Sequence, residues 1–424
     1  MLKSAPPVGW KKTALDHLAE VQTGIAKGKP INGAAVTVPY LRVANVQDGH
    51  VDLSVIKEIS LKPSEVDRYS LRKGDVLFTE GGDFDKLGRG TVWNGEIEPC
   101  LHQNHVFAVR PNPDRLLPEF LAFQAASQYG RRYFQLSSKQ STNLASINST
   151  QLKQFPVLLP PIPEQRKIAE ILQTWDEALV NLESLLAAKL RRYRALTHAL
   201  VFGVRQLDRF RTTDEVAAHR WFTLPATWGI KPIGKLAREI SERNGDGVRH
   251  EVLSCSKYDG FVRSLEYFKK QVFSADLSGY KKIWRGDFGF PSNHVEEGSI
   301  GLQNLTDVGV VSPIYTVFRF APEKVDADYA FAVLKTGLYR HIFEVSTSAS
   351  VDRRGSLRWS EFSKLPFPLP SLAEQRAIAE VLRTAQTDLD ALNTEIEALT
   401  RQKRGLMQKL LTGEWRLVAD PIDA

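Results

Sequence analysis

The chain has 424 residues, of which 42% are hydrophobic and 25% are charged, so about three globular domains are expected and wholesale disorder is excluded. Its two cysteines, Cys100 and Cys255, exclude a disulfide framework and a four-cysteine zinc site. The 56 Lys and Arg residues against 49 Asp and Glu residues give a net charge of +7, a mild excess that suits a phosphate-bearing partner without requiring one.

Residues 1–154 predict a first β-rich domain. Its short apolar runs, TVPYLRVANV, GDVLFTEGG, GTVW and HVFAVRP, are separated by turn residues, as strands of a globular sheet are. One helix is expected near the end of this region, over the segment PEFLAFQAASQYGRRYF. A proline-rich stretch, FPVLLPPIP, then ends the domain.

Residues 155–204 predict a long helix. Its apolar positions alternate spacings of four and three, the heptad pattern of a coiled coil, with one lapse at Lys189. A first-turn acid and a glycine after the last apolar position are start and stop signals. The helix should span about 38 residues, or roughly 57 Å. The predicted seam consists of Ile168, Leu172, Leu179, Leu182, Leu186, Leu196 and Leu200.

The same organisation then repeats. Residues 205–364 predict a second β-rich domain with the runs EVLSCSKYDG, GDFGFPSN, GSIGL and IYTVFRF, followed by a helix over DYAFAVLKTGLYRHIF. Residues 365–424 predict a second long helix with one lapse in its seam, at Lys403. The second predicted seam consists of Ile378, Leu382, Leu389, Leu392, Ile396, Leu399, Leu406 and Leu410.

The two helix regions are copies of one another. FPVLLPPIPEQRKIAEIL and LPFPLPSLAEQRAIAEVL align without a gap at an offset of 210 residues, and 16 of the 40 positions from Glu164 to Gly203 are identical. The β-rich regions share only landmarks, such as Trp10 with Trp228 and Gly74-Asp75 with Gly286-Asp287. The expected fold is therefore α+β. Two mixed α/β, β-rich domains are separated by two long helices that form an intramolecular antiparallel coiled coil, and the internal duplication gives a pseudo-two-fold.

Motifs that would indicate an enzyme are not found in this sequence. It contains no nucleotide-hydrolysis loop, no nucleophile elbow and no zinc-protease motif. The glycine-rich segment GGDFDKLGRG carries acidic residues where a phosphate cradle needs bare amides. Cys100, His102 and His105 are a possible metal triple without an evident fourth ligand, so no metal site is expected. The start, MLKSAPPVGWKK, lacks the apolar core of a signal peptide, so a cytoplasmic protein with no membrane span is expected.

The order of these elements resembles the specificity subunit of type I restriction-modification systems. The resemblance rests on P-x-x-x-E-Q-R followed by I-A-E-x-L in both copies and on the closing LMQKLLTGEWRL, and it covers essentially the whole chain. It implies a non-catalytic subunit with two target-recognition domains, each reading one half of a bipartite double-stranded DNA site. It also implies recruitment of two modification subunits, which methylate adenine N6, and of restriction subunits that translocate and cut DNA. S-adenosylmethionine, ATP and Mg²⁺ are then expected on those partners, and no cofactor in this chain.

A duplicated chain with antiparallel helices also matches the two-fold relation of half-sites on a duplex. A rod of roughly 57 Å spans at most about 17 base pairs of unread spacer. The predicted base-reading residues are loop side chains of the types that recognise base edges or phosphates. They are Arg42, Asn45, Gln47, Lys86, Arg89, Gln103, Asn104, Lys139, Gln140 and Ser141 in the first domain, and Lys257, Tyr258, Arg263, Lys281, Ser292, Asn293, His294, Arg353 and Arg354 in the second.

Two further interpretations stay open at the level of sequence. The repeated Glu-Gln-Arg blocks either initiate the helices or contact a modification subunit, and the residues concerned are Glu164, Gln165, Arg166, Glu374, Gln375 and Arg376. The basic residues near the helix ends, such as Arg191 and Arg404, either complement the helix dipole or approach DNA phosphates. The alternative function is a coiled-coil adaptor that joins protein partners without sequence-specific DNA binding.

Overall fold

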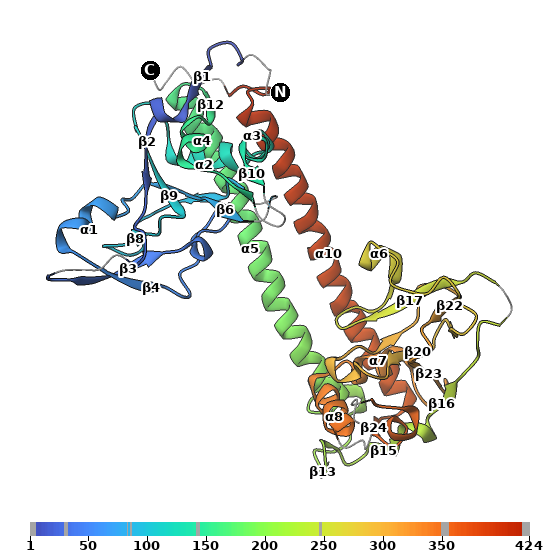
Figure 1. The fold of residues 1–424 in the computed structure, drawn as a ribbon. Helices are drawn as coiled ribbons and strands as arrows, with labels where there is room; N and C mark the ends of the chain where they lie inside the picture. The colour runs from blue at the N-terminus through green and yellow to red at the C-terminus, as the bar shows by residue number, and fades with distance from the viewer. Residues whose placement is uncertain are drawn as a thin grey trace. The chain divides into compact units, whose positions relative to one another are not determined.

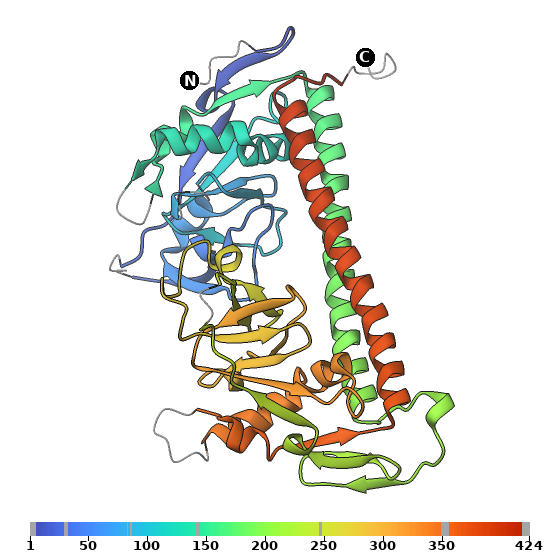
Figure 2. The same cartoon turned by 90° about the vertical axis from the view of Figure 1, so that its right-hand side faces the viewer.

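The computed structural model contains two 40-residue helices, α5 (Ile162–Val201) and α10 (Leu372–Leu411). They lie side by side in both views (Figures 1 and 2). The structure describes residues 6–28, 33–82, 84, 87–140, 145–245, 248–348 and 356–417. It divides into two compact units, Met1–Glu183 with Thr394–Ala424, called unit 1 here, and Ser184–Asn393, called unit 2. Each unit therefore contains one β-rich domain and half of each long helix.

The helices pair antiparallel, as predicted. In unit 1 the Lys403 ammonium forms an ion pair with Asp176, and in unit 2 Lys189 Nζ lies 3.7 Å from an Asp388 oxygen, so residue numbers rise along one helix as they fall along the other. Both lysines are the lapses in the heptad pattern. Their acidic partners explain why a cation is tolerated at the edge of the seam. All fifteen predicted seam residues are buried or half-buried.

Each helix ends at a glycine in the left-handed region. Gly203 has φ +64° and Gly413 has φ +71°. A Cβ added at Gly203 would lie 2.3 Å from a ring carbon of Pro225, and one at Gly413 would lie 2.4 Å from a ring carbon of Pro7. Both positions therefore need glycine for its backbone conformation and for its lack of a side chain.

The domain in unit 1 is built on a four-stranded antiparallel sheet. Its strand order is β2-β9-β5-β7, and helices α2 and α3 cover it over a core that includes Phe78, Phe120 and Phe134. Ser127 caps α3 and breaks the helix that the sequence predicted as continuous into two. The sheet strands are Ala19–Thr23, Val106–Pro111, Val76–Thr79 and Gly90–Val92, and the helices are Pro118–Ala126 and Gln128–Ser137.

Smaller elements surround this sheet. The strands β4-β3-β8 and β10-β11-β6 form two three-stranded sheets, and β1 pairs with β12 immediately before α5. Their bounds are β1 Lys11–Ala14, β3 Val36–Leu41, β4 Lys57–Leu61, β6 Gly81–Gly82, β8 Leu101–His102, β10 Lys139–Gln140, β11 Ala145–Ser146, β12 Pro156–Leu159, α1 Pro63–Tyr69 and α4 Ser149–Lys153.

The domain in unit 2 repeats this plan with different peripheral strands. The sheet β16-β23-β20-β21 takes the place of β2-β9-β5-β7, and α7 with α8 takes the place of α2 with α3. A second four-stranded sheet, β18-β17-β22-β19, replaces the smaller sheets of unit 1. The bounds are β16 Ala237–Ile240, β17 Glu251–Ser256, β18 Gly260–Arg263, β19 Lys281–Trp284, β20 Phe288–Pro291, β21 Gly301–Leu302, β22 Val308–Val311, β23 Tyr315–Phe320, α7 Ala327–Leu334 and α8 Gly337–Ser348.

The remaining elements of unit 2 frame its helices. Strand β15 pairs with β24 just before α10, as β1 pairs with β12 just before α5. These elements are β13 Val216–Ala218, β14 Thr223–Pro225, β15 Gly229–Pro232, α6 Ser264–Phe268, α9 Trp359–Phe362 and β24 Pro366–Leu369. The expected domain boundaries at residues 154 and 364 fall just before β12 and β24. Within the part of the chain that the structure describes, no helix combines the length and apolarity needed to cross a bilayer.

Candidate nucleic-acid interface

The Gly-Asp landmarks of the two β-rich domains are equivalent turns. Asp75 is fully buried and accepts two hydrogen bonds of 2.8 Å from the guanidinium of Arg110. In unit 2 the buried Asp287 accepts one of 2.6 Å from Arg319 Nε. Such charge-assisted pairs hold the start of β5 against β9 and the start of β20 against β23. The same scaffold therefore supports the loop after β5 and the loop after β20.

In unit 1 this scaffold brings together four segments that are far apart in the sequence. The backbone N–H of Glu80 donates to His105 O at 2.9 Å, and that of Ile147 donates to Glu80 O at 2.7 Å. Arg89 Nη1 donates to Gln47 Oε1 at 3.1 Å. The described residues of the loops around 42–55, 80–90 and 103–105 and of strands β10 and β11 consequently form one surface, called surface A here.

The predicted residues of surface A differ in accessibility. Arg42, Gln47, Arg89, Gln103 and Asn104 are half-buried, and Lys139 is exposed. Asn45 is only 3% exposed, and its amide donates to the carbonyls of residues 52 and 55, so it holds the loop from inside. Lys86, Ser141 and the side chain of Gln140 lie outside the described residues.

Unit 2 forms an equivalent surface, called surface B here, from other loops. Lys335 Nζ donates to Lys257 O at 2.8 Å and to Gly298 O at 3.0 Å, which ties the β17–β18 turn to the loop after β20. The backbone N–H of Leu357 donates to Ser292 O at 2.8 Å. Nothing in the sequence distinguished Lys335, because its role depends on two carbonyls that the fold brings to it.

The predicted residues of surface B are mostly accessible. Lys257, Tyr258 and His294 are exposed, and Tyr258 reaches 75%, while Arg263, Ser292 and Asn293 are half-buried. Ser292 Oγ donates to Ile314 O at 2.8 Å. Arg353 and Arg354 lie outside the described residues.

Lys281 is half-buried and engaged inside unit 2. Its Nζ donates to Tyr315 O at 2.6 Å, and burial lowers the pKa of this ammonium. Arg263 lies near two carboxylates, with Nε 3.4 Å from Glu251 and Nη1 3.5 Å from Glu266. Both cations are therefore less available to a ligand than Lys257.

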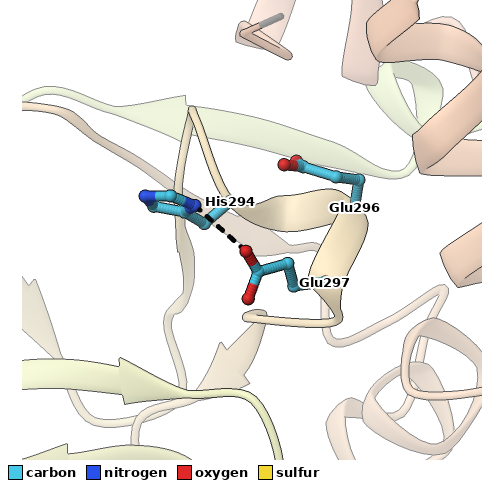
Figure 3. Close-up of side chains that lie close together, drawn as sticks. All are labelled: His294, Glu296 and Glu297. Atoms are coloured by element: carbon cyan, nitrogen blue, oxygen red, sulfur yellow. Dashed lines mark ion pairs between the residues drawn. The ribbon is translucent and has the colours of Figure 1, made fainter.

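A group that could hold a metal ion lies at the end of the loop after β20. His294, Glu296 and Glu297 place their ligand atoms within 4.8 Å of one another, and it is the one such group among the described residues. Figure 3 shows the ion pair of 3.4 Å between His294 Nδ1 and Glu297 Oε1, with Glu296 beside it on the same turn. Exposed acidic groups of this kind are common without a metal, and the expectation of no metal site stays a prediction.

The Cys100, His102 and His105 triple is engaged in other contacts. Burial raises the pKa of the Cys100 thiol to about 12 and lowers the pKa of His102, whose Nδ1 lies 2.6 Å from Val106 O. His105 Nδ1 instead contacts the Glu80 carboxylate. A thiol that burial holds neutral is poorly suited to bind a metal, because the thiolate is the metal ligand.

The repeated Glu-Gln-Arg blocks anchor each domain to its helix. Gln165 Oε1 accepts from the Leu117 backbone N–H at 2.9 Å, and its Nε2 donates to Arg115 O and Pro160 O, both at 2.9 Å. In unit 2, Gln375 Oε1 accepts from the Asp326 backbone N–H at 2.9 Å. Its Nε2 donates to Lys324 O at 3.1 Å and to Pro370 O at 3.0 Å. Both glutamines are fully buried.

The glutamates of the two blocks are also buried, each 4% exposed, but their partners differ. Arg416 donates to both oxygens of Glu164, at 2.8 and 3.0 Å, and Trp10 Nε1 donates to Oε2 at 3.0 Å. Glu374 accepts from Gln206 Nε2 at 3.3 Å. Desolvation raises the pKa of Glu374, and the hydrogen bond from Gln206 lowers it by less.

Comparison with known proteins identifies one group of similar proteins. The family described as "Type I restriction modification DNA specificity domain" matches residues 7–192. A Methanocaldococcus jannaschii protein named as the specificity subunit of the type I restriction enzyme MjaX is 22% identical, over 97% of this chain and 95% of the relative. Residues 7–192 therefore match a type I restriction-modification DNA specificity domain, and the chain resembles type I specificity subunits along nearly its whole length. The resemblance inferred from sequence is confirmed.

Solved structures of specificity subunits support the fold. The S subunit of a type I system from M. genitalium has a TM-score of 0.54 at 15% identity and covers 96% of this chain and 97% of its own. A chain from a study of complex assembly and conformational transition of the type I R-M system has a TM-score of 0.58 at 18% identity. The match covers 97% of this chain and 100% of that chain. At these identities the likeness concerns the fold alone.

The predicted partner-contact residues of this chain fall into two classes. Glu164, Gln165, Glu374 and Gln375 are buried and bonded within their own units, which agrees with a structural role at the start of each helix. Arg166 and Arg376 are exposed at equivalent positions. Contact between these residues and a modification subunit stays a prediction, and the arginines are the members that remain accessible for it.

Proposed function

We propose that this chain is the non-catalytic subunit that sets the DNA sequence specificity of a type I restriction-modification complex. Surface A reads one half of a bipartite, asymmetric site and surface B reads the other. The observation that carries the proposal is a repeated scaffold with different loops. The pairs Asp75–Arg110 and Asp287–Arg319 are equivalent, while the loops that they position differ in sequence and in strand content. Two different readers on one scaffold suit two different half-sites.

The chemistry of the loops suits DNA. Arg, Gln and Asn are the side chains that recognise base edges with paired hydrogen bonds, and Lys binds phosphates. Surface A contains Arg89 and Gln47 in contact with each other. Surface B contains the exposed Lys257 and Tyr258. We propose that these side chains contact the duplex.

The paired helices supply the spacing and the docking sites. We propose that the antiparallel coiled coil sets the length of the unread spacer and binds two adenine-N6 methyltransferase subunits, with restriction subunits recruited through them. Arg166 and Arg376 are the exposed members of the repeated blocks and are offered as contacts to these two subunits. S-adenosylmethionine, ATP and Mg²⁺ would be bound by the partner subunits.

Mapping of methylated adenines by single-molecule sequencing tests this proposal. DNA from the host with the gene intact is compared with DNA from a host that lacks it. Loss of methylation at one bipartite, asymmetric motif is the expected result, and it would supply both half-sites and the spacer. If no motif changes, the chain is next co-expressed with the adjacent methyltransferase in a methylation-free host. If that host also gains no methylated motif, the adaptor function is favoured instead.

A further inference from the structure

The outer faces of α5 and α10 share an exposed pair of arginines. At the repeat offset of 210 residues, Arg191 and Arg194 are equivalent to Arg401 and Arg404, and all four are exposed. In the heptad pattern these positions lie away from the seam. Within each pair the two side chains are three residues apart and therefore lie on one side of the helix.

Other exposed positions of the two helices have diverged. Glu177 corresponds to Thr387, and Ala187 corresponds to Glu397. A solvated position away from the seam is free to change, because surface substitutions have little effect on stability. A pair of arginines kept in both copies therefore points to a constraint that acts on both.

The helix dipole does not supply that constraint. Arg191 lies ten residues before Val201, the last residue of α5, and Arg401 lies ten residues before Leu411, the last residue of α10. The interaction of a cation with the dipole fades beyond the last turn of a helix. The arginines are two to three turns from the helix ends, so this effect is too weak to select them.

Pairing between the helices does not supply it either. The cations that face the partner helix are lysines, such as Lys189 with Asp388. Among the described residues, the ion pair formed by the four arginines is that of Arg401 with Glu397, at 3.8 Å with both side chains largely exposed. An exposed ion pair of this kind contributes little to stability. The other three arginines are free to bind a ligand.

The segments that carry the arginines contain no acidic residue. Residues 184–207 contain five cations and residues 398–413 contain four, without one Asp or Glu in either segment. The cations are Lys189, Arg191, Arg192, Arg194 and Arg205 in the first and Arg401, Lys403, Arg404 and Lys409 in the second. Lys189, Lys403 and Lys409 pair with carboxylates outside these segments, so the arginines are the cations that can attract a polyanion.

We propose that Arg191 with Arg194, and Arg401 with Arg404, bind the sugar-phosphate backbone of a DNA duplex. Guanidinium groups bind phosphate oxygens through paired charge-assisted hydrogen bonds. The backbone is chemically the same whatever the base sequence, so an identical pair in both copies matches it, while the recognition loops differ because the half-sites differ. This inference rests on the proposed function and adds a contact that reads no bases.

A second group of exposed residues kept in both copies is different in character. Arg166, Glu170 and Thr174 recur as Arg376, Glu380 and Thr384, and all six are exposed. This group carries both signs of charge and a hydroxyl, which suits a protein surface. The arginine pairs carry one sign of charge, which suits a polyanion, so we assign DNA to them.

The test is the salt dependence of DNA binding by the full-length chain in complex with its modification subunits. The variant carries Arg191→Gln, Arg194→Gln, Arg401→Gln and Arg404→Gln, because glutamine has nearly the helix propensity of arginine. Binding is measured on a duplex without a recognition site. The slope of log affinity against log salt should fall by about 0.9 for each lost phosphate contact, and so by about 3.6 if all four contacts are lost.

Arg192→Gln is the matched control. Arg192 is an exposed cation between the two arginines, but its equivalent is Gln402, so it should leave the slope unchanged. The half-variant with only Arg191→Gln and Arg194→Gln should show about half of the change. It preserves a measurable result if the fourfold variant folds poorly.

Three outcomes would overturn the inference. If the wild-type complex binds with strong salt dependence and the variants keep its slope, the arginines do not contact DNA and the proposed function stands. If the variants keep the slope but lose the modification subunits, the arginines bind protein. If the wild-type complex itself shows no salt-dependent binding, the proposed function fails together with the inference.

Discussion

Arg416 and Glu164, 252 positions apart in the sequence, form a two-pronged ion pair with N–O distances of 2.8 and 3.0 Å. The pair joins the segment after α10 to the first turn of α5 inside unit 1. The Glu164 carboxylate is almost completely buried, whereas the Arg416 side chain is 36% exposed. Loss of the arginine would leave a buried carboxylate with only Trp10 and a backbone N–H as donors.

Arg416→Ala should therefore lower the free energy of unfolding. Removing one partner of a buried ion pair costs about 3–5 kcal/mol, and the partial exposure of Arg416 reduces the expected loss to about 1–2 kcal/mol. Urea unfolding measures this loss in the free energy of unfolding. The exposed Lys153→Ala is the control and should change stability by less than about 0.5 kcal/mol. Equal stability of Arg416→Ala and wild type would show that the pair contributes nothing.

Glu374 should make unit 2 less stable as the pH rises. Burial raises the pKa of this carboxyl above its ordinary value of 4.5, so the folded state holds the proton more tightly than the unfolded state. The resulting stabilisation is complete below pH 4.5 and is lost as the pH rises through the raised pKa. Glu374→Gln removes the titrating group, so its free energy of unfolding should depend less on pH across this window.

Gln206→Arg provides the complementary test. Gln206 occupies the position equivalent to Arg416, at the repeat offset of 210 residues. A guanidinium beside Glu374 should favour the charged carboxylate, lower its pKa and raise stability at neutral pH. Thermal unfolding at pH 4 and pH 8 separates these effects. A variant that is stabilised equally at both pH values would contradict an electrostatic origin.

Gln165→Ala should loosen the attachment of the first domain to α5. The substitution removes three hydrogen bonds and leaves a backbone N–H and two carbonyls without them. The expected loss is about 2 kcal/mol, with faster amide hydrogen exchange at Leu117. Gln173→Ala, at an exposed position of the same helix, should show neither effect. An unchanged exchange rate at Leu117 would exclude this role for Gln165.

Changes within surface A should alter one half of the methylated motif. Arg89→Ala removes a guanidinium that is positioned by Gln47, and loss of a base contact costs about 1–3 kcal/mol of discrimination. Methylome sequencing should show relaxed sequence at one half-site and an unchanged second half-site. The same experiment with Lys257→Ala, on surface B, should affect the second half-site only. If either variant relaxes both halves, the two surfaces do not read independently.

A shortened coiled coil should shift the preferred spacer. Deletion of residues 180–186 from α5 together with 393–399 from α10 removes one heptad from each helix and keeps the seam in register. Seven residues correspond to about 10.5 Å, or about 3 base pairs. Methylome sequencing should then find the same two half-sites with a spacer about 3 base pairs shorter. An unchanged spacer would show that the helices do not set it.

The sequence by itself determined the two repeated helices and their pairing with each other. A heptad pattern of over four repeats leaves a long apolar seam that must be covered, and the only sequence of matching length and pattern was its own copy. The 210-residue offset predicted the duplication, and glycines at 203 and 413 marked both helix ends correctly. These features are local or periodic, so they can be read without knowing which loops meet.

The tertiary structure decided which side chains are available at the two surfaces. Asn45 belongs to a residue type that reads bases, yet it is buried and bonded to its own loop. Lys335 lies at the end of a helix far along the chain and ties two loops together. Gln165 and Gln375 lie in a visible motif, but two of the three backbone partners of each lie about 50 residues earlier. Accessibility and long-range hydrogen bonds depend on which segments the fold brings together, and sequence periodicity does not encode that.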